Sequence, residues 1–303
     1  PMRIALATCA NLPDWEVDDA PLHEALRRRG VDLHQPAWDD PRFEWAACDA
    51  VLIRTTWDYM ERCDEYVAWA DRVAARTRLY NPPAVVRWNT HKRYLRELEE
   101  RGIRTAPTVW LDRGGRADVA GLMRDRGWRR GFIKPAIGAT ARETLRFAAD
   151  GEGLAAAQAH VDRLLPREDL MLQPYLETVE TAGEVSAIFI DEEVTHCVRK
   201  VPVPGDYRVQ DDFDAHDEPT TFSGSDLERA RAAVGAAESI LNVNLLYARA
   251  DFLRDPASGD LLLTELEMVE PSLFFRHGPD AADRLAEALL RRIETESHPA
   301  SAP

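Results

Sequence analysis

Short apolar runs that alternate with helical patterns most strongly restrict the fold of this chain. In the first third of the sequence this alternation is typical of an α/β domain with a mostly parallel sheet. We expect strands at residues 2–7, 31–34 and 50–53, and helices at residues 21–29, 65–76 and 91–101. Ligands of such sheets bind beyond the carboxyl ends of the strands, so the loops at residues 8–19 and 54–59 are candidate substrate loops.

The pattern changes near residue 107, where neighbouring strands begin to follow one another without a helix between them. Two α+β units are therefore expected after the α/β domain. The polar, proline-rich end of the chain is expected to fray. The predicted division is an N-terminal domain at residues 2–88, a central unit at 89–176, a C-terminal unit at 177–296 and a tail at 297–303.

Charge and cysteine content argue against several classes of protein. The net charge of −15 makes a nucleic-acid partner unexpected, because phosphate backbones bind basic surfaces. No apolar run reaches membrane-spanning length, so no membrane partner is expected. The four cysteines are widely spaced and form no C-x-x-C pair. This favours reduced thiols in a cytoplasmic protein over a zinc site or a disulfide framework.

Lysine occurs at only three positions, Lys92, Lys134 and Lys200, and all other members of the 38 basic residues are arginine. Lysine is a compact point charge and arginine is a planar fork, so lysine suits a position where one charge must fit between phosphate oxygens. Lys134 lies in FIKPAIGATARET, beside small residues whose backbone N–H groups are suited to binding the same phosphates. The alternative is that Lys134 is a solvated surface charge.

Three carboxylates are expected to meet on one side of a strand pair. Glu265 and Glu267 are two residues apart in a predicted strand, so their side chains leave the same face. Asp251 lies in the preceding strand and can face them across an antiparallel hairpin. The three would repel one another without a cation, and oxygen-only ligands suit Mg²⁺. The alternative is an acidic, solvent-facing strand, which the apolar runs at 261–263 and 273–275 argue against.

Four segments occur in an order that resembles the ATP-grasp superfamily, and in particular its glutathione synthetase-like branch. They are residues 89–110, 132–144, 170–190 and 247–275. The resemblance covers nearly the whole chain. It implies an ATP-grasp fold, in which two α+β subdomains clasp ATP behind an N-terminal parallel α/β domain. ATP and Mg²⁺ are therefore the expected cofactors.

The resemblance also implies roles for individual residues of the nucleotide site. The phosphates would be bound by Lys92, Lys134, Gly138 and Thr140. Adenine would be met by Gln173, Tyr175 and Leu176. The Mg²⁺ ligands would be Asp251, Glu265 and Glu267. Glu184 would bind the ribose, with Glu177 and Glu180 as alternatives. The family usually has Asn at the position of Glu267, which leaves the number of bound metal ions open.

The reaction implied by the resemblance forms an acyl phosphate on a small carboxylate substrate, and an amine-type nitrogen then displaces phosphate. Positioning and charge neutralisation supply most of the catalysis in such transfers. Residues 199–210 resemble the segment that carries basic groups to the γ-phosphate in glutathione synthetase-like enzymes. Lys200 is therefore a predicted catalytic residue. Arg208 and Arg249 would stabilise the acyl phosphate and orient the carboxylate, since arginine pairs with carboxylates in a bidentate way.

In size and in its loops TCANLPDWEVDDAP and RTTWDY, the chain resembles the small stand-alone ATP-grasp ligases of actinobacterial secondary metabolism. One specific expected reaction is the intramolecular closure of O-ureido-D-serine to D-cycloserine. The alternatives are an intermolecular ligase that joins an amino acid to an amine or peptide, and a catalytically silent nucleotide-binding module. Relatives are often dimers, so the resemblance also implies a homodimer.

The substrate is expected to contact the two N-terminal loops. Trp57 would cap the substrate, and one of the nearby aspartates would meet its ammonium group. The alternative is that Trp57 packs in the core and the aspartates are ordinary loop and cap residues. The predicted substrate residues are Asp14, Asp18, Arg54, Trp57, Asp58 and Ser272.

Overall fold

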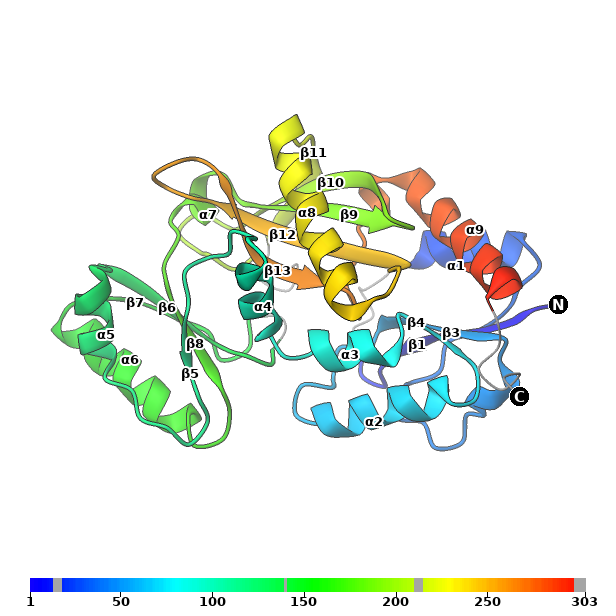
Figure 1. Ribbon diagram of the computed structural model, residues 1–303, viewed down its shortest axis with the longest axis horizontal. Coiled ribbons are helices and arrows are strands. Elements are labelled where there is room, and N and C mark those ends of the chain that lie inside the picture. Colours follow the sequence, from blue (N-terminus) through cyan, green and yellow to red (C-terminus); the bar gives the residue numbers. More distant parts are fainter. Residues whose placement is uncertain (13–17, 139–140, 210–214, 297–303) are drawn as a thin grey trace.

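The computed structural model describes residues 1–12, 18–138, 141–209 and 215–296. Its strands form three sheets, one in each of three successive stretches of the chain (Figure 1). The first sheet is parallel and the other two are antiparallel, which is the predicted mixture of α/β and α+β structure. Thr140, Asp14 and the predicted tail at 297–303 lie outside the described residues. Within the described ranges, no helix is long and apolar enough to cross a membrane.

The N-terminal sheet has the strand order β2-β1-β3-β4. Its strands are β1 (Arg3–Thr8), β2 (Asp32–His34), β3 (Ala50–Thr55) and β4 (Arg78–Tyr80). Both faces are covered, so the strands are apolar on both sides. Ile4 and Leu6 pack towards α1 (Ala20–Arg28) on one face. Ala5 and Ala7 pack towards α2 (Cys63–Ala74) and α3 (Pro83–Asn89) on the other face.

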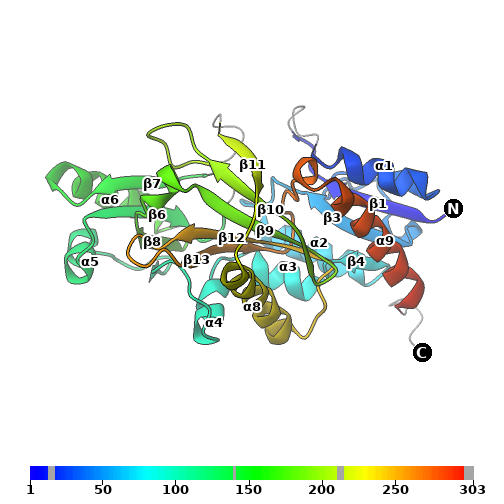
Figure 2. The same ribbon diagram turned by 90° about the horizontal axis from the view of Figure 1, so that it is seen from above.

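The last helix of the chain, α9 (Pro279–Thr295), lies beside α1 in both views (Figures 1 and 2). It buries Leu285 and Leu289 in the same core cluster as β1 and β3. Arg29 of the α1 C-terminus pairs with Asp283 and Glu287, each at 2.9 Å. The end of the chain therefore completes the core of the N-terminal sheet, although the sequence placed this helix with the C-terminal unit.

The middle sheet has the order β5-β8-β6-β7 and lies at the end of the molecule opposite the N-terminal sheet (Figure 1). Its strands are β5 (Val109–Leu111), β6 (Arg130–Pro135), β7 (Leu145–Ala148) and β8 (Leu170–Pro174). Its outer face packs on α5 (Val119–Arg126) and α6 (Gly151–Leu164). Ile133 points into that helical layer, so its neighbours Phe132 and Lys134 point the other way, towards the third sheet.

The third sheet has the order β11-β10-β9-β12-β13 and is antiparallel throughout. Its strands are β9 (Glu184–Ile190), β10 (Glu193–Val201), β11 (His216–Thr220), β12 (Tyr247–Arg254) and β13 (Leu261–Glu267). Helix α8 (Gly224–Leu241) covers one face, where Ala187, Ala250 and Phe252 are buried. The alternate residues, including Ser186 and Asp251, face the opposite side. That side carries the candidate site.

Several short elements were not predicted. They are β4, β11, α3, α7 (Thr178–Thr181) and two 3₁₀ turns, Trp45–Ala47 and Phe275–His277. Strand β11 has the sequence HDEPT and carries no apolar pattern, because it is an exposed sheet edge. The helix predicted at residues 91–101 begins later than expected, as α4 (Tyr94–Glu100). This leaves Lys92 on the turn before the helix, where its backbone N–H donates to Ala136 O at 2.8 Å.

Candidate active site

A cavity of about 270 Å³ lies between the inner faces of the second and third sheets. Phe132 and Lys134 of β6 line one wall, and Lys200 of β10 and Arg249 of β12 line the other. Trp57, from the loop that follows β3, lines it from the N-terminal domain. Three separate parts of the chain therefore contribute side chains to one site.

The strand pair β12–β13 places four charged side chains on one face. Asp251 is paired with Glu265 and Arg249 with Glu267 in the antiparallel register. The predicted meeting of Asp251, Glu265 and Glu267 is therefore confirmed, and one carboxylate oxygen from each lies within 4.8 Å of the others. A register shift follows Asp251, so the consecutive residues Thr264 and Glu265 both line the cavity. Such bulges often re-aim side chains beside active sites.

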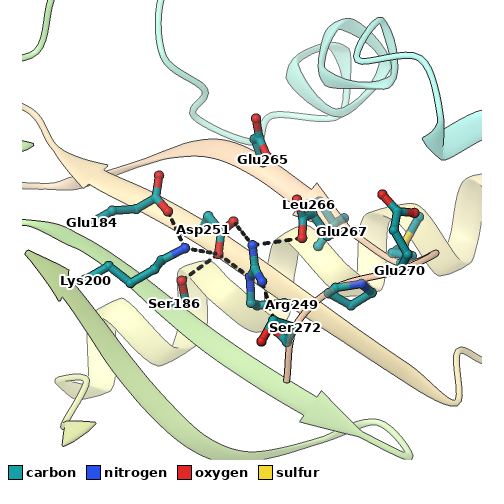
Figure 3. Close-up of polar contacts among 12 residues, drawn as sticks. Glu184, Ser186, Lys200, Arg249, Asp251, Glu265, Leu266, Glu267, Glu270 and Ser272 are labelled. Atoms are coloured by element: carbon teal, nitrogen blue, oxygen red, sulfur yellow. Dashed lines mark hydrogen bonds and ion pairs between the residues drawn. The ribbon is translucent and has the colours of Figure 1, made fainter. Parts of the chain in front are cut away.

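Cations of the chain itself offset the expected repulsion between these carboxylates (Figure 3). Arg249 binds Asp251 through two nitrogens, Nε and Nη2, each at 2.9 Å, and its Nη2 lies 2.8 Å from Glu267. The Lys200 ammonium lies 2.5 Å from Glu184 and 3.7 Å from Asp251. Ser186 donates its hydroxyl proton to Asp251 at 2.5 Å. Opposite charges thus alternate across the floor of the site.

Lys92 and Lys134 approach the same oxygen of Glu265, with Nζ–Oε1 distances of 3.4 and 3.6 Å. Lys92 also donates to the carbonyl of Gly138 at 3.0 Å. Burial disfavours the charged form of Glu265, but the two ammonium groups outweigh it and lower its pKa to about 2. Burial lowers the pKa of Lys134. Lys200 lines the same cavity, so all three lysines of the chain lie at one site.

Two further carboxylates of the cavity have raised pKa values. Burial, together with the charges of Asp251 and Glu265, raises the pKa of Glu267 to about 8, although Arg249 opposes the shift. Burial also raises the pKa of Glu270 to about 7. Carboxyl groups whose pKa values are raised towards 7 by burial and by neighbouring charges are typical of functional sites. An added cation would stabilise the ionised form of both.

The predicted adenine residues Gln173, Tyr175 and Leu176 line the cavity at the end of β8. Their side chains already have partners, because Gln173 donates to Thr108 Oγ1 at 2.9 Å and Tyr175 donates to Glu180 at 2.6 Å. The backbone N–H of Tyr175 donates to Arg130 O at 2.9 Å. Of the three predicted ribose acids, Glu184 lines the cavity. Glu180 instead holds Tyr175, and Glu177 pairs with Arg130 at 2.9 Å.

The predicted substrate residues fall into two groups. Trp57 and Ser272 line the cavity, as does the predicted catalytic Arg208, which pairs with Asp206 at 2.7 Å. Arg54 and Asp58 have other positions. Arg54 is buried and binds Asp19 at 2.8 and 2.9 Å.

Asp58 accepts a hydrogen bond from Trp38 Nε1 at 2.7 Å. Asp18 accepts from Ser272 Oγ at 3.0 Å and pairs with Arg276 at 2.9 Å. Arg54, Asp58 and Asp18 are not among the described residues that line the cavity. Their contacts stabilise the structure around the candidate substrate loops, which is the alternative that the sequence left open for the aspartates.

The chain is 33% identical over 312 residues to the cycloserine biosynthesis protein DcsG of Streptomyces lavendulae, an alignment that covers 96% of this chain and 99% of that protein. The chain belongs to the DcsG family of ATP-grasp ligases. The family model described as D-cycloserine synthetase DcsG, N-terminal domain, matches residues 4–81. The crystal structure of D-cycloserine synthetase DcsG superposes with a TM-score of 0.86 at 30% identity and covers 96% of this chain and 99% of that chain.

More distant ATP-grasp ligases share the fold of the DcsG family. D-alanine–D-alanine ligase from Bacillus anthracis, solved with ATP, has a TM-score of 0.70 at 14% identity and covers 97% of this chain and 98% of its own. The ligase PsnB, solved with a minimal precursor, has a TM-score of 0.64 at 20% identity and covers 96% and 99%. The predicted ATP-grasp fold is confirmed, and this protein is an ATP-dependent ligase.

Sequence patterns do not predict Glu270 and Phe274, which line this cavity, or Tyr59, which contacts Glu270. Glu270 lines the cavity but follows the end of β13, so the two-residue spacing of strand side chains did not reach it. Phe274 is part of an apolar run in the sequence, yet its ring lies 5.7 Å from Lys200 Nζ and 5.5 Å from the Arg249 guanidinium. Tyr59 reaches Glu270 from the N-terminal loop at 3.1 Å. The loop sequence RTTWDY carried the only signal for Tyr59.

Proposed function

We propose that this ligase closes O-ureido-D-serine to D-cycloserine through an acyl phosphate. The observation that carries the proposal is the cavity in which Lys92, Lys134, Lys200 and Arg249 surround three carboxylates. Such a charge pattern suits the binding of a nucleoside triphosphate next to the carboxylate with which it reacts. The identity with DcsG over nearly the whole chain supports D-cycloserine formation, and therefore a place in antibiotic biosynthesis.

The donor set of the cavity fits Mg²⁺. Asp251, Glu265 and Glu267 offer oxygen ligands only, and the cation prefers these while also bridging substrate phosphates. Lys92 and Lys134 share the Glu265 carboxylate, so both ammonium groups are already positioned beside the proposed metal ligands. When bound, Mg²⁺ would neutralise phosphate charge. Lys92, Lys134 and the Gly138 loop would hold the α- and β-phosphates.

In the proposed reaction, the substrate carboxylate attacks the γ-phosphorus of ATP, and ADP leaves. Lys200, Arg208 and Arg249 would neutralise the charge that builds up on the transferred phosphate and the acyl oxygen. The nitrogen bonded to oxygen in the same substrate then attacks the acyl carbon, loses its proton, and inorganic phosphate leaves. Water removes the carbamoyl group from that nitrogen as carbamic acid, which completes the balance from O-ureido-D-serine to D-cycloserine.

The test is stoichiometric. Purified enzyme, Mg²⁺, ATP and O-ureido-D-serine are incubated without any second amine, and ADP and the ring product are followed by mass spectrometry. We expect one ADP for each D-cycloserine, and no ADP when EDTA removes the metal. ADP that forms only after a second amine or amino acid is added would contradict ring closure and favour the intermolecular ligase.

A homodimer is also part of the proposal, because relatives with this fold often form one. Light scattering during gel filtration measures the mass directly. A mass equal to that of one 34.2 kDa chain would contradict this part of the proposal and leave the reaction untouched.

A further inference from the structure

Glu270 differs from the other described acids of the cavity in its charged neighbours. Among the cavity-lining residues that the structure describes, Glu184, Asp251, Glu265 and Glu267 each have an ion-pair partner within 4 Å, and Glu270 has none. Its carboxylate accepts a hydrogen bond from the Tyr59 hydroxyl at 3.1 Å. A partly buried carboxylate without a close cation is less well stabilised in its charged form than its paired neighbours, although the more distant charges of Lys92 and Arg249 oppose the effect of burial.

The N-terminal loop holds Glu270 in place from two sides. Trp57 Nε1 donates to the backbone carbonyl of Glu270 at 2.9 Å, and the Tyr59 hydroxyl donates to its carboxylate. Tyr59 itself is buried and stacks on Tyr66, with a centroid distance of 4.5 Å and an interplanar angle of 15°. The carboxylate is therefore fixed in position before any ligand arrives, which is what recognition of a small charged group requires.

Glu270 lies at the end of the cavity that the N-terminal loop with Trp57 contacts. In Figure 3 it lies beyond Glu267, on the side away from Glu184 and Lys200. Two residues later, the carbonyl of Ser272 accepts a hydrogen bond from Arg249 Nη1 at 2.9 Å. The segment that carries Glu270 is therefore hydrogen-bonded to Arg249. An α-amino acid carries its ammonium and carboxylate groups on the same carbon atom. A substrate whose carboxylate is oriented by Arg249 would bring its ammonium group close to Glu270.

We propose that Glu270 binds the α-ammonium group of the amino-acid substrate and so determines that the ligase accepts amino acids rather than simple carboxylic acids. This inference rests on the proposed function and names the group that selects its substrate. It also moves ammonium recognition away from Asp18 and Asp58, which are already bound to Arg276 and Trp38. The pKa of about 7 at Glu270 is consistent with a carboxylate that still lacks a cationic partner.

The test compares two ligands in matched variants. One ligand is O-ureido-D-serine, and the other is the same molecule with hydrogen in place of the α-amino group. Glu270→Gln keeps an oxygen for the Tyr59 hydroxyl but removes the charge. The control is Glu61→Gln, the same substitution at an exposed position two residues after Tyr59. Each KM comes from ADP release, and an inhibition constant replaces it for a ligand that is not turned over.

For Glu270→Gln we expect the KM of O-ureido-D-serine to rise about tenfold or more, with kcat changed much less, because one charged hydrogen bond is lost on binding. Affinity for the deaminated ligand should not fall, and Glu61→Gln should behave like the wild type. A KM that rises equally for both ligands, or stays unchanged for both, overturns the inference. So does a loss of kcat at unchanged KM, which would make Glu270 a group of the chemical step.

Failure of the proposed function gives a different result. In that case the wild type releases no ADP with O-ureido-D-serine. The comparison is then repeated with an ammonium-bearing carboxylate that does release ADP, and with its deaminated form. Loss of discrimination between these two ligands in Glu270→Gln supports the inference, and unchanged discrimination contradicts it.

Discussion

Lys134 has a mostly buried ammonium group 3.6 Å from the Glu265 carboxylate, and the preceding strand residue, Ile133, points into a helical layer. Replacement by Arg keeps the charge but brings in a planar fork where a point charge is enclosed. We expect Lys134→Arg to weaken ATP binding about tenfold or more, and Lys134→Ala to weaken it to a similar degree. Calorimetric titration with a non-hydrolysable ATP analogue and Mg²⁺ measures this effect. Affinity of Lys134→Arg equal to that of the wild type would mean that charge alone matters at this position.

Residue-scale prediction from the sequence worked where spacing or family pattern determines position. Glu265 and Glu267 share a face because a strand alternates its side chains, and their meeting with Asp251 follows from hairpin pairing. Glu270 and Tyr59 could not be found in this way. They meet across 211 positions of the chain, and their contact depends on how the N-terminal domain packs against the third sheet.

At the scale of elements, Asn81 joins the N-terminal domain to the sheet that carries the site. It follows β4, its side chain is 1% exposed, and its amide donates to Tyr247 O at 3.0 Å and to Met268 O at 2.8 Å. The side-chain carbonyl oxygen of Asn81 accepts a hydrogen bond from the backbone N–H of Leu246 at 3.0 Å. Three backbone groups of the β12 and β13 ends therefore depend on one side chain.

We expect Asn81→Ala to lower the free energy of unfolding by about 3 kcal/mol, because buried backbone groups would lose their partners. Urea denaturation at one pH measures the change, with Asn244→Ala as the matched control because Asn244 is exposed. A loss below about 1 kcal/mol would show that water or a local shift satisfies these groups instead.

The accuracy of the predicted elements follows their length and pattern. The helices predicted at 21–29 and 65–76 are found at Ala20–Arg28 and Cys63–Ala74, because each carries an apolar face along its length. The three-residue strand β4 and the four-residue helix α7 were missed. Elements this short carry too few residues for a period, and their conformation is imposed by neighbouring strands and helices.

At the scale of the whole molecule, α9 connects the two ends of the chain. The division predicted from the sequence counted this helix in the C-terminal unit, since that unit immediately precedes it. In the structure it shares a core with α1, β1 and β3, and its polar edge pairs with Arg28 and Arg29 of α1. The face of the N-terminal sheet that α1 covers is thus also covered by a distant segment, and the stability of that sheet should depend on α9.

Leu285 tests this dependence because it lies in α9 and is fully buried against the N-terminal core. We expect Leu285→Ala to lower the free energy of unfolding by about 2–5 kcal/mol, through lost burial and the cavity left behind. Unfolding in urea is followed by tryptophan fluorescence in a background where Trp110 and Trp128 of the middle unit are replaced by Phe. The N-terminal tryptophans, including buried Trp38 and Trp69, then contribute most of the signal. Leu290→Ala, at a partly buried position of the same helix, should shift the midpoint less. If Leu285→Ala moves the transition seen by circular dichroism but not the one seen by fluorescence, the N-terminal sheet is stable without α9.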